Sequence, residues 1–455
     1  MRFETINPVN NQLVKRYPVH SWRQAQAILK KTESGFDINR TGTITIRSKR
    51  MNALADLLEN KKLFCAQIIT LEMGKPIKEA IAEIEKCVKC CRYYAENAKF
   101  FLAEQTVTTS YSSSMISYQP LGVVLAIMPW NFPFWQVFRA VVPAIMSGNV
   151  VLLKHAANVP QCAKLIEDLF LQATFPEGVL QNLFIDHNKI KWVIESQQIA
   201  AVTLTGSETA GSRIGELAGR SIKKTVLELG GSDPFIVLED ANVKEAARTA
   251  VRARMTNCGQ SCIAAKRFIV METVFSDFVR EYVDELLQLK MGDPTDASVD
   301  IGPMARQDLA DNLEKQVKES MRLGAQALIG GGKPHGASGA FFNPTLLVKV
   351  RPGMPVFDQE VFGPVASVIT AKTVNEAIEL ANKTKYGLGA SIWTTDTDKA
   401  LRLARQIQAG SVFINEMVVS HPGLPFGGIK HSGFGRELGE FGIKEFTNVK
   451  TIVVK

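Results

Sequence analysis

The sequence lacks an uninterrupted apolar run of the roughly 18 residues that a membrane-spanning helix requires. It also lacks the apolar core of a secretory leader, because residues 1–5 read MRFET. No block of lysine and arginine is interleaved with aromatic residues, so the formal net charge of +8 does not indicate a nucleic-acid ligand. We therefore expect a cytoplasmic protein that has neither a membrane nor a nucleic acid as its partner.

The seven cysteines are an odd number in a long chain, which is not the pattern of a secreted disulfide framework. Cys87, Cys90 and Cys91 include a C-x-x-C spacing, but no second Cys or His pair follows at the spacing of a zinc site. The three thiols fall within residues 76–103, where apolar side chains recur at helical spacing. We predict that they pack in a core and that they form no metal site.

Buried strands and helical patterns alternate along the chain, which indicates an α/β fold. The length of 455 residues is consistent with about three domains. Short apolar runs typical of parallel strands occupy residues 123–127, 150–153, 200–205, 235–238 and 267–270. Helical patterns occupy residues 76–103, 243–256 and 274–289, and others begin near Pro133 and Pro160.

Two segments contain residues suited to covalent acyl transfer, VLELGG at 226–231 and NCGQSC at 257–262. The thiolate of Cys262 would attack a carbonyl carbon, and a neighbouring base would then deliver water to the thioester. Glu228 lies between two leucines, where partial desolvation raises a carboxyl pKa and suits it to proton transfer near neutrality. Cys258 precedes the nucleophile in the same segment, so a reversible disulfide between Cys258 and Cys262 remains an open alternative.

A third segment, IMPWNFP at 127–133, places Asn131 between prolines that fix the local backbone. A tetrahedral intermediate needs hydrogen-bond donors held where negative charge develops. We predict that the Asn131 side chain and the backbone N–H of Cys262 supply these donors.

Gly206 and Ser207 follow the strand at 200–205 and precede a helical pattern that carries Gly211. Backbone N–H groups at such a helix N-terminus are suited to a pyrophosphate. The segment lacks the usual G-x-G-x-x-G, so the pattern alone is explained equally well by an ordinary helix cap.

Taken together and in order, these segments make the chain similar to the NAD(P)-dependent aldehyde dehydrogenase superfamily. The matching motifs are INP at 6–8, PWNFP at 129–133, TGS at 205–207, ELGG at 228–231, GQSC at 259–262, EVFGP at 360–364, PFGG at 425–428 and SGFGRE at 432–437. KHAAN at 154–158 and GGSDPFIVL at 230–238 resemble most the bacterial succinate-semialdehyde dehydrogenase branch of that superfamily.

The resemblance implies a Rossmann-like NAD(P)-binding domain formed by residues 1–105 and 122–228, and an α/β catalytic domain formed by residues 229–428. It also implies that residues 106–121 and 429–455 form an oligomerisation arm of β-strands. The protein would then be a homodimer or a homotetramer.

The resemblance also assigns roles to residues at matching positions. Cys262 would be the nucleophile, Glu228 the general base and Asn131 the oxyanion donor, while Lys154 and Glu360 would hold the two riboses of the cofactor. The full set of expected cofactor contacts is Ile127, Met128, Pro129, Trp130, Lys154, Gly206, Ser207, Gly211, Leu229, Glu360 and Phe362. The expected substrate contacts are Arg139, Ser420, His421 and Phe426. For five of these residues, packing alone is as good an explanation as a contact with cofactor or aldehyde: Trp130, Gly206, Leu229, Phe362 and Phe426.

Two departures from the family pattern affect which cofactor and which substrate we expect. Many NAD-preferring relatives carry a glutamate where this chain has Ala157, so a 2′-phosphate would meet no carboxylate there, and Lys154 and His155 would offer positive charge. Arg139 matches a carboxylate ligand of succinate-semialdehyde dehydrogenases and is expected to point toward the channel mouth. Thr256 stands where some of these enzymes have a further arginine.

We therefore predict an enzyme that oxidises a semialdehyde, with succinate semialdehyde favoured, to the carboxylic acid with NAD or NADP. The reaction would pass through a thiohemiacetal and a thioester on Cys262. Glutarate semialdehyde or an aliphatic aldehyde is the alternative substrate. A relative that releases the thioester to coenzyme A, or a catalytically silent protein with this fold, is a further alternative, although Glu228 favours hydrolysis.

Overall fold

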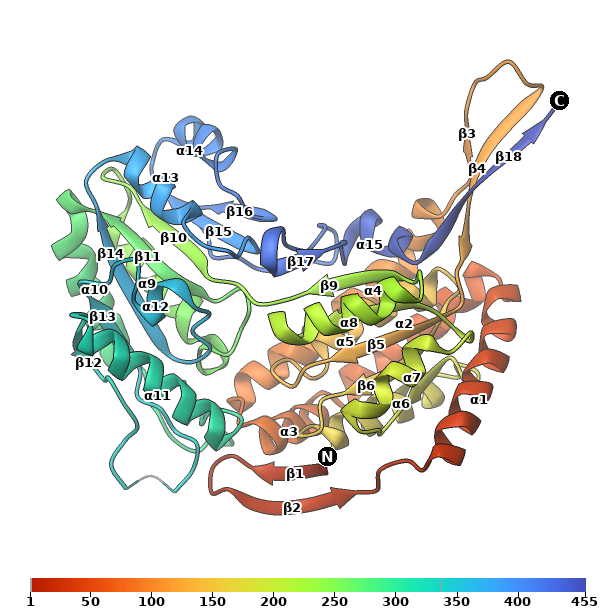
Figure 1. The fold of residues 1–455 in the computed structure, drawn as a ribbon, viewed down its shortest axis with the longest axis horizontal. Helices are drawn as coiled ribbons and strands as arrows, with labels where there is room; N and C mark the ends of the chain where they lie inside the picture. The colour runs from red at the N-terminus through yellow and green to blue at the C-terminus, as the bar shows by residue number, and fades with distance from the viewer. Residues whose placement is uncertain (1, 337) are drawn as a thin grey trace.

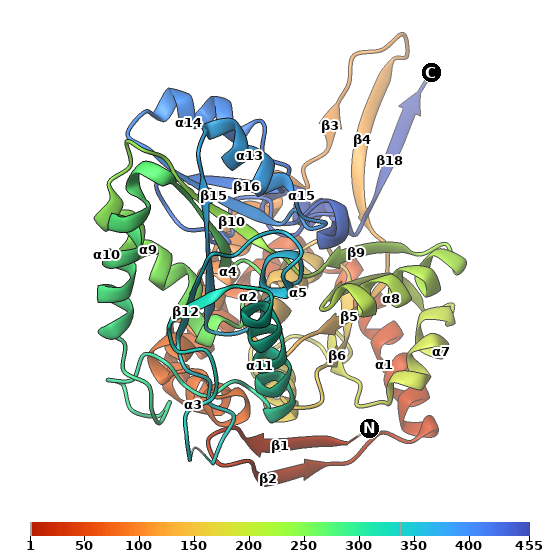
Figure 2. The ribbon, with the colours of Figure 1, turned by 60° about the vertical axis from the view of Figure 1, so that its left-hand side comes forward.

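The computed structural model describes residues 2–336 and 338–455. Two lobes, each built on a mainly parallel sheet covered by helices, lie side by side, and a three-stranded antiparallel arm extends from one of them (Figure 1). Figure 2 shows from another side that the arm stands clear of both lobes, with the C-terminus at its end. The predicted α/β class with a strand arm is confirmed.

The first sheet has six strands, which are parallel except for the short edge strand β17. In spatial order they are β17 (Gly433–Phe434), β9 (Lys224–Glu228), β8 (Ile199–Thr205), β5 (Val123–Met128), β6 (Val150–His155) and β7 (Leu180–Asn182). The helices of this lobe are α1 (Trp22–Thr41), α2 (Ile44–Asn60), α3 (Lys62–Met73), α4 (Ile77–Phe101), α5 (Trp135–Met146), α6 (Pro160–Gln172), α7 (Ile190–Glu195), α8 (Glu208–Arg220) and α15 (Gly439–Glu445). The central strand β5 (VVLAIM) and the first four residues of β6 (VVLL) are continuously apolar, as expected where helices cover both faces of a sheet.

The second sheet has seven strands, parallel except for the edge strand β12. In spatial order they are β12 (Gln326–Ile329), β13 (Thr345–Val348), β14 (Val365–Ala371), β11 (Ala265–Met271), β10 (Asp233–Val237), β15 (Gly389–Trp393) and β16 (Ser411–Ile414). Its helices are α9 (Val243–Met255), α10 (Phe275–Leu287), α11 (Gln307–Arg322), α12 (Pro355–Asp358), α13 (Val374–Asn382) and α14 (Thr397–Ala404). The two lobes have separate hydrophobic cores.

The arm is a sheet in which β4 (Ser113–Pro120) lies between β18 (Thr447–Val454) and β3 (Gln105–Thr106). Of the segment 429–455 expected in the arm, only β18 belongs to this sheet, whereas β17 pairs with β9 and α15 packs against α5. The N-terminal strands β1 (Phe3–Asn7) and β2 (Gln12–Tyr17) form a hairpin of their own. The proposed domain limits themselves remain a prediction.

All seven cysteines are free thiols, and those on α4 are fully buried in the core of the first lobe. The core position predicted for Cys87, Cys90 and Cys91 is therefore confirmed. Across residues 2–336 and 338–455, no helix combines the length and the apolar character needed to cross a membrane.

A buried carboxylate fixes the start of α5. Glu83, on α4, accepts hydrogen bonds from the backbone N–H groups of Phe134 at 2.8 Å and Trp135 at 2.9 Å. Its second carboxylate oxygen pairs with the ammonium of Lys75, and both side chains are almost fully buried. The Lys75 Nζ in turn lies 3.7 Å from the centroid of the Phe132 ring. A negative charge at a helix N-terminus is stabilised by the free N–H groups and the helix dipole, so Glu83 holds the PWNFP segment in place.

Glu83→Ala should lower the free energy of unfolding by about 3 to 5 kcal/mol, because Lys75 would be left buried without a counter-charge. The shift in the midpoint of chemical denaturation measures the loss. Glu96→Ala, on the exposed face of the same helix, is the matched control and should change the stability by less than about 0.5 kcal/mol. Equal small effects of both substitutions would contradict the role given to the Glu83 carboxylate.

Candidate active site

The loop that carries Cys262 has an unusual backbone. Asn257, Cys258 and Gly259 have φ angles of 55°, 53° and 69°, so three consecutive residues are left-handed. Such angles disfavour residues with a Cβ by roughly 1–2 kcal/mol each. They persist only where the surroundings over-determine them. At Gly259 an added Cβ would lie 2.1 Å from the carbonyl oxygen of Gly363, so only glycine fits there.

Hydrogen bonds from both lobes hold this loop. The Asn257 side chain donates to the carbonyl oxygens of Asn131 at 2.7 Å and Gln260 at 3.1 Å. The backbone N–H of Asn257 donates to the carboxylate of Glu79 on α4 at 2.7 Å. The Gln260 side chain accepts a hydrogen bond from the backbone N–H of Ala305 at 2.9 Å. The nucleophile loop of the second lobe is thereby tied to the PWNFP segment of the first.

Two buried cations complete the support of the loop. Arg254, at the end of α9, donates to the carbonyl oxygens of Gly259 and Gly363. Lys266, in β11, donates from Nζ to the carbonyl oxygen of Cys262 at 2.8 Å and to two neighbouring carbonyls. The positive charges are solvated by backbone dipoles, and the nucleophile's carbonyl is fixed in direction.

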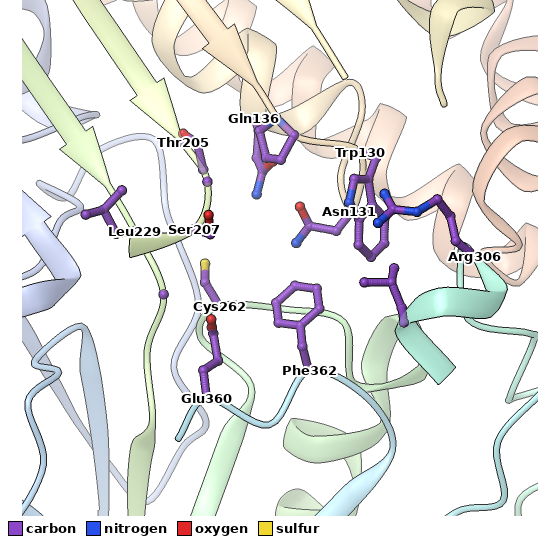
Figure 3. A pocket seen from close by; sticks show the side chains of 14 residues that line it. Trp130, Asn131, Gln136, Thr205, Ser207, Leu229, Cys262, Arg306, Glu360 and Phe362 are labelled. Atoms are coloured by element: carbon purple, nitrogen blue, oxygen red, sulfur yellow. The ribbon is translucent and has the colours of Figure 1, made fainter. Parts of the chain in front are cut away.

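The Asn131 side chain is aimed by one of its own hydrogen bonds. Its Nδ2 donates to the carbonyl oxygen of Gln260 at 3.0 Å. A primary amide has two N–H donors, so the second remains available to a ligand. Figure 3 shows the Asn131 amide and the Cys262 thiol on the same cavity, with the Trp130 and Phe362 rings on its wall. This is the arrangement required of an oxyanion donor beside a nucleophile.

Burial raises the pKa of the Cys262 thiol to about 11, against the lowering effect of the charges of Arg139 and Lys266. The carboxylates of Glu360 and Glu228 add to the rise. A thiol with such a pKa is protonated at neutral pH, so its attack requires a proton acceptor.

Glu228 is the last residue of β9 and only 2% exposed. Burial raises its pKa well above the usual range, and the neighbouring carboxyl of Glu437 raises it further. Arg139 and Arg436 act in the opposite direction. An added Cβ at Gly427 would lie 2.6 Å from Glu228 Oε1, so the PFGG loop covers this carboxyl closely. Within the described part of the chain neither carboxyl oxygen has a hydrogen-bond partner, which leaves both free for a proton or a water molecule.

The cavity has a volume of about 370 Å³ and combines many of the residues expected from the sequence. The expected residues that line it are Pro129, Trp130, Asn131, Gly206, Ser207, Leu229, Cys262, Glu360 and Phe362. The lining residues that sequence reasoning did not single out are Gln136, Thr205, Gly230, Arg306 and Leu309. Thr205 and Gly230 lie inside motifs already recognised. The Arg306 guanidinium lies 5.9 Å from the centroid of the Trp130 ring. Arg306 comes from a loop distant in sequence, and no motif in the sequence indicates that it reaches the cavity.

Other expected cofactor contacts lie outside the cavity lining. Ile127 and Met128 belong to β5, and Lys154 is in β6, where burial lowers its pKa to about 8. Gly211, whose cofactor contact stays a prediction, is buried in the first turns of α8, and an added Cβ would lie 2.4 Å from Leu229. Its lack of a side chain therefore serves the packing of α8 against Leu229.

The structure corrects the expectation that His155 offers positive charge to the cofactor. Its Nδ1 accepts a hydrogen bond from the backbone N–H of Ala156 at 2.9 Å, and its Nε2 therefore carries the proton donated to the carbonyl oxygen of Pro133 at 2.8 Å. Burial lowers the pKa of His155 to about 4. The ring is neutral at physiological pH and offers no positive charge to a cofactor phosphate.

Arg139 does not project to a channel mouth, contrary to the expectation. Its side chain is 2% exposed on α5 and forms a buried ion pair with Glu437. Its guanidinium lies 4.3 Å from the centroid of the Phe426 ring. A guanidinium already paired with a carboxylate is less available to a substrate carboxylate. Ser420 and His421 line a separate cavity, against α4.

The structure does not favour a disulfide between Cys258 and Cys262. The Cys258 side chain is 1% exposed and belongs to the core of the second lobe, whereas Cys262 packs against the core of the first. The two thiols thus face different cores.

The sequence matches the Aldehyde dehydrogenase family over residues 1–452. The chain belongs to this family. It is 50% identical over 452 residues to a protein named probable succinate-semialdehyde dehydrogenase [NADP(+)] from Synechocystis sp., a match that covers 99% of each chain. It is 47% identical to succinate-semialdehyde dehydrogenase [NADP(+)] from Mycobacterium avium, covering 99% of this chain and 96% of that one. The crystal structure of succinic semialdehyde dehydrogenase from Streptococcus pyogenes in complex with NADP+ matches with a TM-score of 0.97 at 34% identity, covering 99% of both chains.

Glu437→Gln should shift the acid limb of the pH–rate profile to lower pH. The Glu437 carboxyl raises the pKa of Glu228, so its neutralisation lets Glu228 ionise at lower pH. Initial rates measured across pH 5 to 9 at saturating substrate test this.

Glu440→Gln, an exposed neighbour, is the matched control and should leave the profile in place. A uniform loss of rate in Glu437→Gln without a shift of the acid limb would mean that Glu437 supports only the structure around Arg139.

Proposed function

We propose that this aldehyde dehydrogenase oxidises succinate semialdehyde to succinate with NADP+. The observation that supports the chemistry is the convergence of the Cys262 thiol and the Asn131 amide on one cavity, with the buried Glu228 carboxyl close enough to raise the pKa of the thiol. The substrate and cofactor are supported by the names of relatives that are 50% and 47% identical over almost the whole chain.

In the proposed reaction the Cys262 thiol first loses its proton to solvent. Its sulfur then forms a bond to the aldehyde carbon, and the carbonyl oxygen becomes an alkoxide. The second Asn131 N–H and the backbone N–H of Cys262 donate hydrogen bonds to this oxygen. After the carbon has been oxidised, the acyl group is a thioester on Cys262. Glu228 takes a proton from water, the hydroxide adds to the thioester carbon, and the carbon–sulfur bond breaks to release the acid and the thiolate.

Residues that line the cavity are suited to the pyrophosphate and a ribose of a dinucleotide. Gly206 and Ser207 open on it at the N-terminus of α8, where free N–H groups favour a pyrophosphate. Glu360 accepts a hydrogen bond from Gly231 N–H at 3.0 Å, which leaves lone pairs for a ribose hydroxyl. An added Cβ at Gly230 would lie 2.4 Å from this carboxylate, so the glycine makes room for Glu360. When bound, NADP+ supplies the acceptor for the hydride that leaves the aldehyde carbon.

NADP+ is proposed over NAD+ because of position 157. Ala157 follows β6 and brings no negative charge against a 2′-phosphate. With His155 neutral, Lys154 is the cation from this segment that can attract the phosphate, since its pKa of about 8 leaves it mainly charged at neutral pH.

We also propose that the arm joins subunits into a homodimer or homotetramer. Val449, Ile452, Val453 and Val454 of β18 are exposed, as are Val107 and Tyr111 near β3 and β4. Apolar side chains on an exposed sheet with open edges favour pairing with another chain.

The enzyme should show its highest kcat/KM with succinate semialdehyde and NADP+, followed by glutarate semialdehyde and then butanal. Coenzyme A should not be required, because Glu228 serves hydrolysis. Initial rates of absorbance at the reduced-nicotinamide band, with each aldehyde, each cofactor, and with or without coenzyme A, test this. A preference for butanal would contradict the proposed substrate.

The cofactor preference has a matched control. Ala157→Glu should weaken NADP+ more than NAD+, whereas the uncharged isostere Ala157→Gln should affect both alike. Equal KM changes for the two cofactors in Ala157→Glu would show that position 157 does not face the adenosine ribose.

Glu228→Gln should retain a pre-steady-state burst of reduced cofactor while steady-state turnover falls by about 10²-fold or more, because the thioester still forms but is hydrolysed slowly. Cys262→Ala should show neither burst nor turnover but should still bind the cofactor. Stopped-flow absorbance and a cofactor titration distinguish the two variants. Unimpaired steady-state turnover in Glu228→Gln would remove Glu228 from the mechanism.

A further inference from the structure

Lys266 directs its whole ammonium group at the loop that carries the nucleophile. The side chain is only 1% exposed. Its Nζ donates to the carbonyl oxygens of Ser261 at 3.2 Å, Cys262 at 2.8 Å and Ala264 at 3.0 Å. An ammonium has three N–H donors, so all of them are used. A neutral amine has only two, and its lone pair would face a carbonyl oxygen, so this geometry requires the charged form of Lys266.

The bond to Ser261 fixes the peptide group that joins Ser261 to Cys262. A trans peptide group is planar, so the N–H of Cys262 points opposite to the carbonyl of Ser261. The Ser261 carbonyl also accepts a hydrogen bond from the backbone N–H of Ala264 at 3.3 Å, which restrains it further. Within residues 2–336 and 338–455 the Cys262 N–H has no protein acceptor. This donor is therefore held in one direction, away from Lys266, and remains available to a ligand.

The ammonium also polarises that peptide group. In a low-polarity interior, hydrogen bonds that run in series through a peptide strengthen one another. A cation at the Ser261 oxygen thus makes the N–H of Cys262 a stronger donor. A stronger donor is what a developing oxyanion requires.

The charge of Lys266 is not cancelled by an ion pair. Burial raises the pKa of the Cys262 thiol, and the charges of Arg139 and Lys266 oppose that rise. Arg139 is paired with Glu437. Lys266 donates to carbonyl oxygens alone, and within the part of the chain that the structure describes no carboxylate forms an ion pair with it. A thiolate on Cys262 would therefore form near an unpaired positive charge, in surroundings that screen charge weakly.

A charged lysine cannot accept the proton of the thiol. When the thiol ionises, its S–H bond breaks, the proton passes to solvent and the sulfur keeps the electron pair. Lys266 favours the ionised form by its charge alone. The other charged or titratable groups that act on the thiol or on the lysine are Arg139 on α5, Glu228 at the end of β9, Asp233 on β10, Arg254 on α9 and Glu360 in the loop before β14.

We propose that Lys266 is a positioning residue of the reaction, which holds the N–H of Cys262 in the direction of an oxyanion donor and supplies an unpaired positive charge that favours the thiolate. The inference rests on the proposed function, in which Cys262 is the nucleophile. It adds a residue that acts through the peptide groups on either side of the thiol.

Alkylation by iodoacetamide measures the thiolate alone, because iodide is displaced in one step and no oxyanion forms. The six other cysteines are buried, so mass spectrometry after short reactions reports the modification of Cys262. In Lys266→Met the pH midpoint of alkylation should rise by about one unit, which slows the reaction near neutrality about tenfold. Lys266→Arg keeps the charge, so its midpoint should stay close to that of the wild type.

Turnover measures both effects, because addition to the aldehyde creates the oxyanion. In Lys266→Met, kcat/KM for the aldehyde that the wild type oxidises best should fall about 10²-fold further than the alkylation rate does, since the N–H donor is no longer held in place. Lys244→Met, an exposed lysine on α9, is the matched control and should change neither measurement.

The outcomes separate this proposal from the proposed function. Full turnover in Cys262→Ala would contradict the function itself. An unchanged alkylation midpoint in folded Lys266→Met would overturn the role of the charge, and equal losses in alkylation and turnover would overturn the positioning of the N–H. If Lys266→Met does not fold, Lys266→Gln replaces it, because the amide keeps donors for the carbonyls but has no charge. Its midpoint should rise as well, and an unchanged midpoint would overturn the proposal.

Discussion

The hydrogen bonds that Glu83 accepts from the first N–H groups of α5 are the constraint on which both cavities depend. The segment that ends at these N–H groups carries Asn131, which faces the nucleophile, and α5 continues with Trp135, which faces Ser420. A displacement of the helix start would therefore move the oxyanion donor and the indole that donates to Ser420 together. The buried Lys75 ammonium supplies the counter-charge to this carboxylate away from solvent.

The surroundings of Cys262 contain several buried cations whose charges are directed at backbone carbonyls. Arg254 and Lys266 support the nucleophile loop, and Arg267 donates to the carbonyl oxygens of Ser232, Leu380 and Ala381. Lys266, together with Arg139, adds positive potential at the thiol, where a thiolate has to form. Because the low-polarity interior screens charge weakly, fixed cations near the thiol offset part of the penalty that burial places on its ionised form.

The sequence predicted the parts of the site that lie in short continuous motifs. The strands at 123–127 and 150–153, the α4 helix, and the positions of Asn131 and Cys262 on one cavity agree with the structure, because each depends on local pattern or on a family motif. Contacts between distant segments could not be predicted in this way. The partner of Arg139 lies in the motif SGFGRE, and Glu437 looked like an ordinary motif residue until the fold placed α15 beside α5.

Lys86 and Arg306 are two further residues whose contacts with distant segments the sequence could not predict. Lys86 lies in a long amphipathic helix in which a lysine is expected to be solvated, and only the loop at Ser420 makes it part of a cavity. At Gly211 the structure adds a packing reason for glycine that the sequence could not show, because the side chain of Leu229 leaves no room for a Cβ.

The burial of α5 has a consequence for how such a site changes in evolution. All 12 residues of this helix are buried, so a substitution on it disturbs the core as well as any substrate contact. The cavity between α4 and the loop at Ser420 contains exposed positions such as Lys89 and His421, which can vary without a void or an overpacked core. Positions on α5 are thus confined by the stability of the whole lobe, whereas the exposed positions on α4 and on the loop that follows β16 are open to drift.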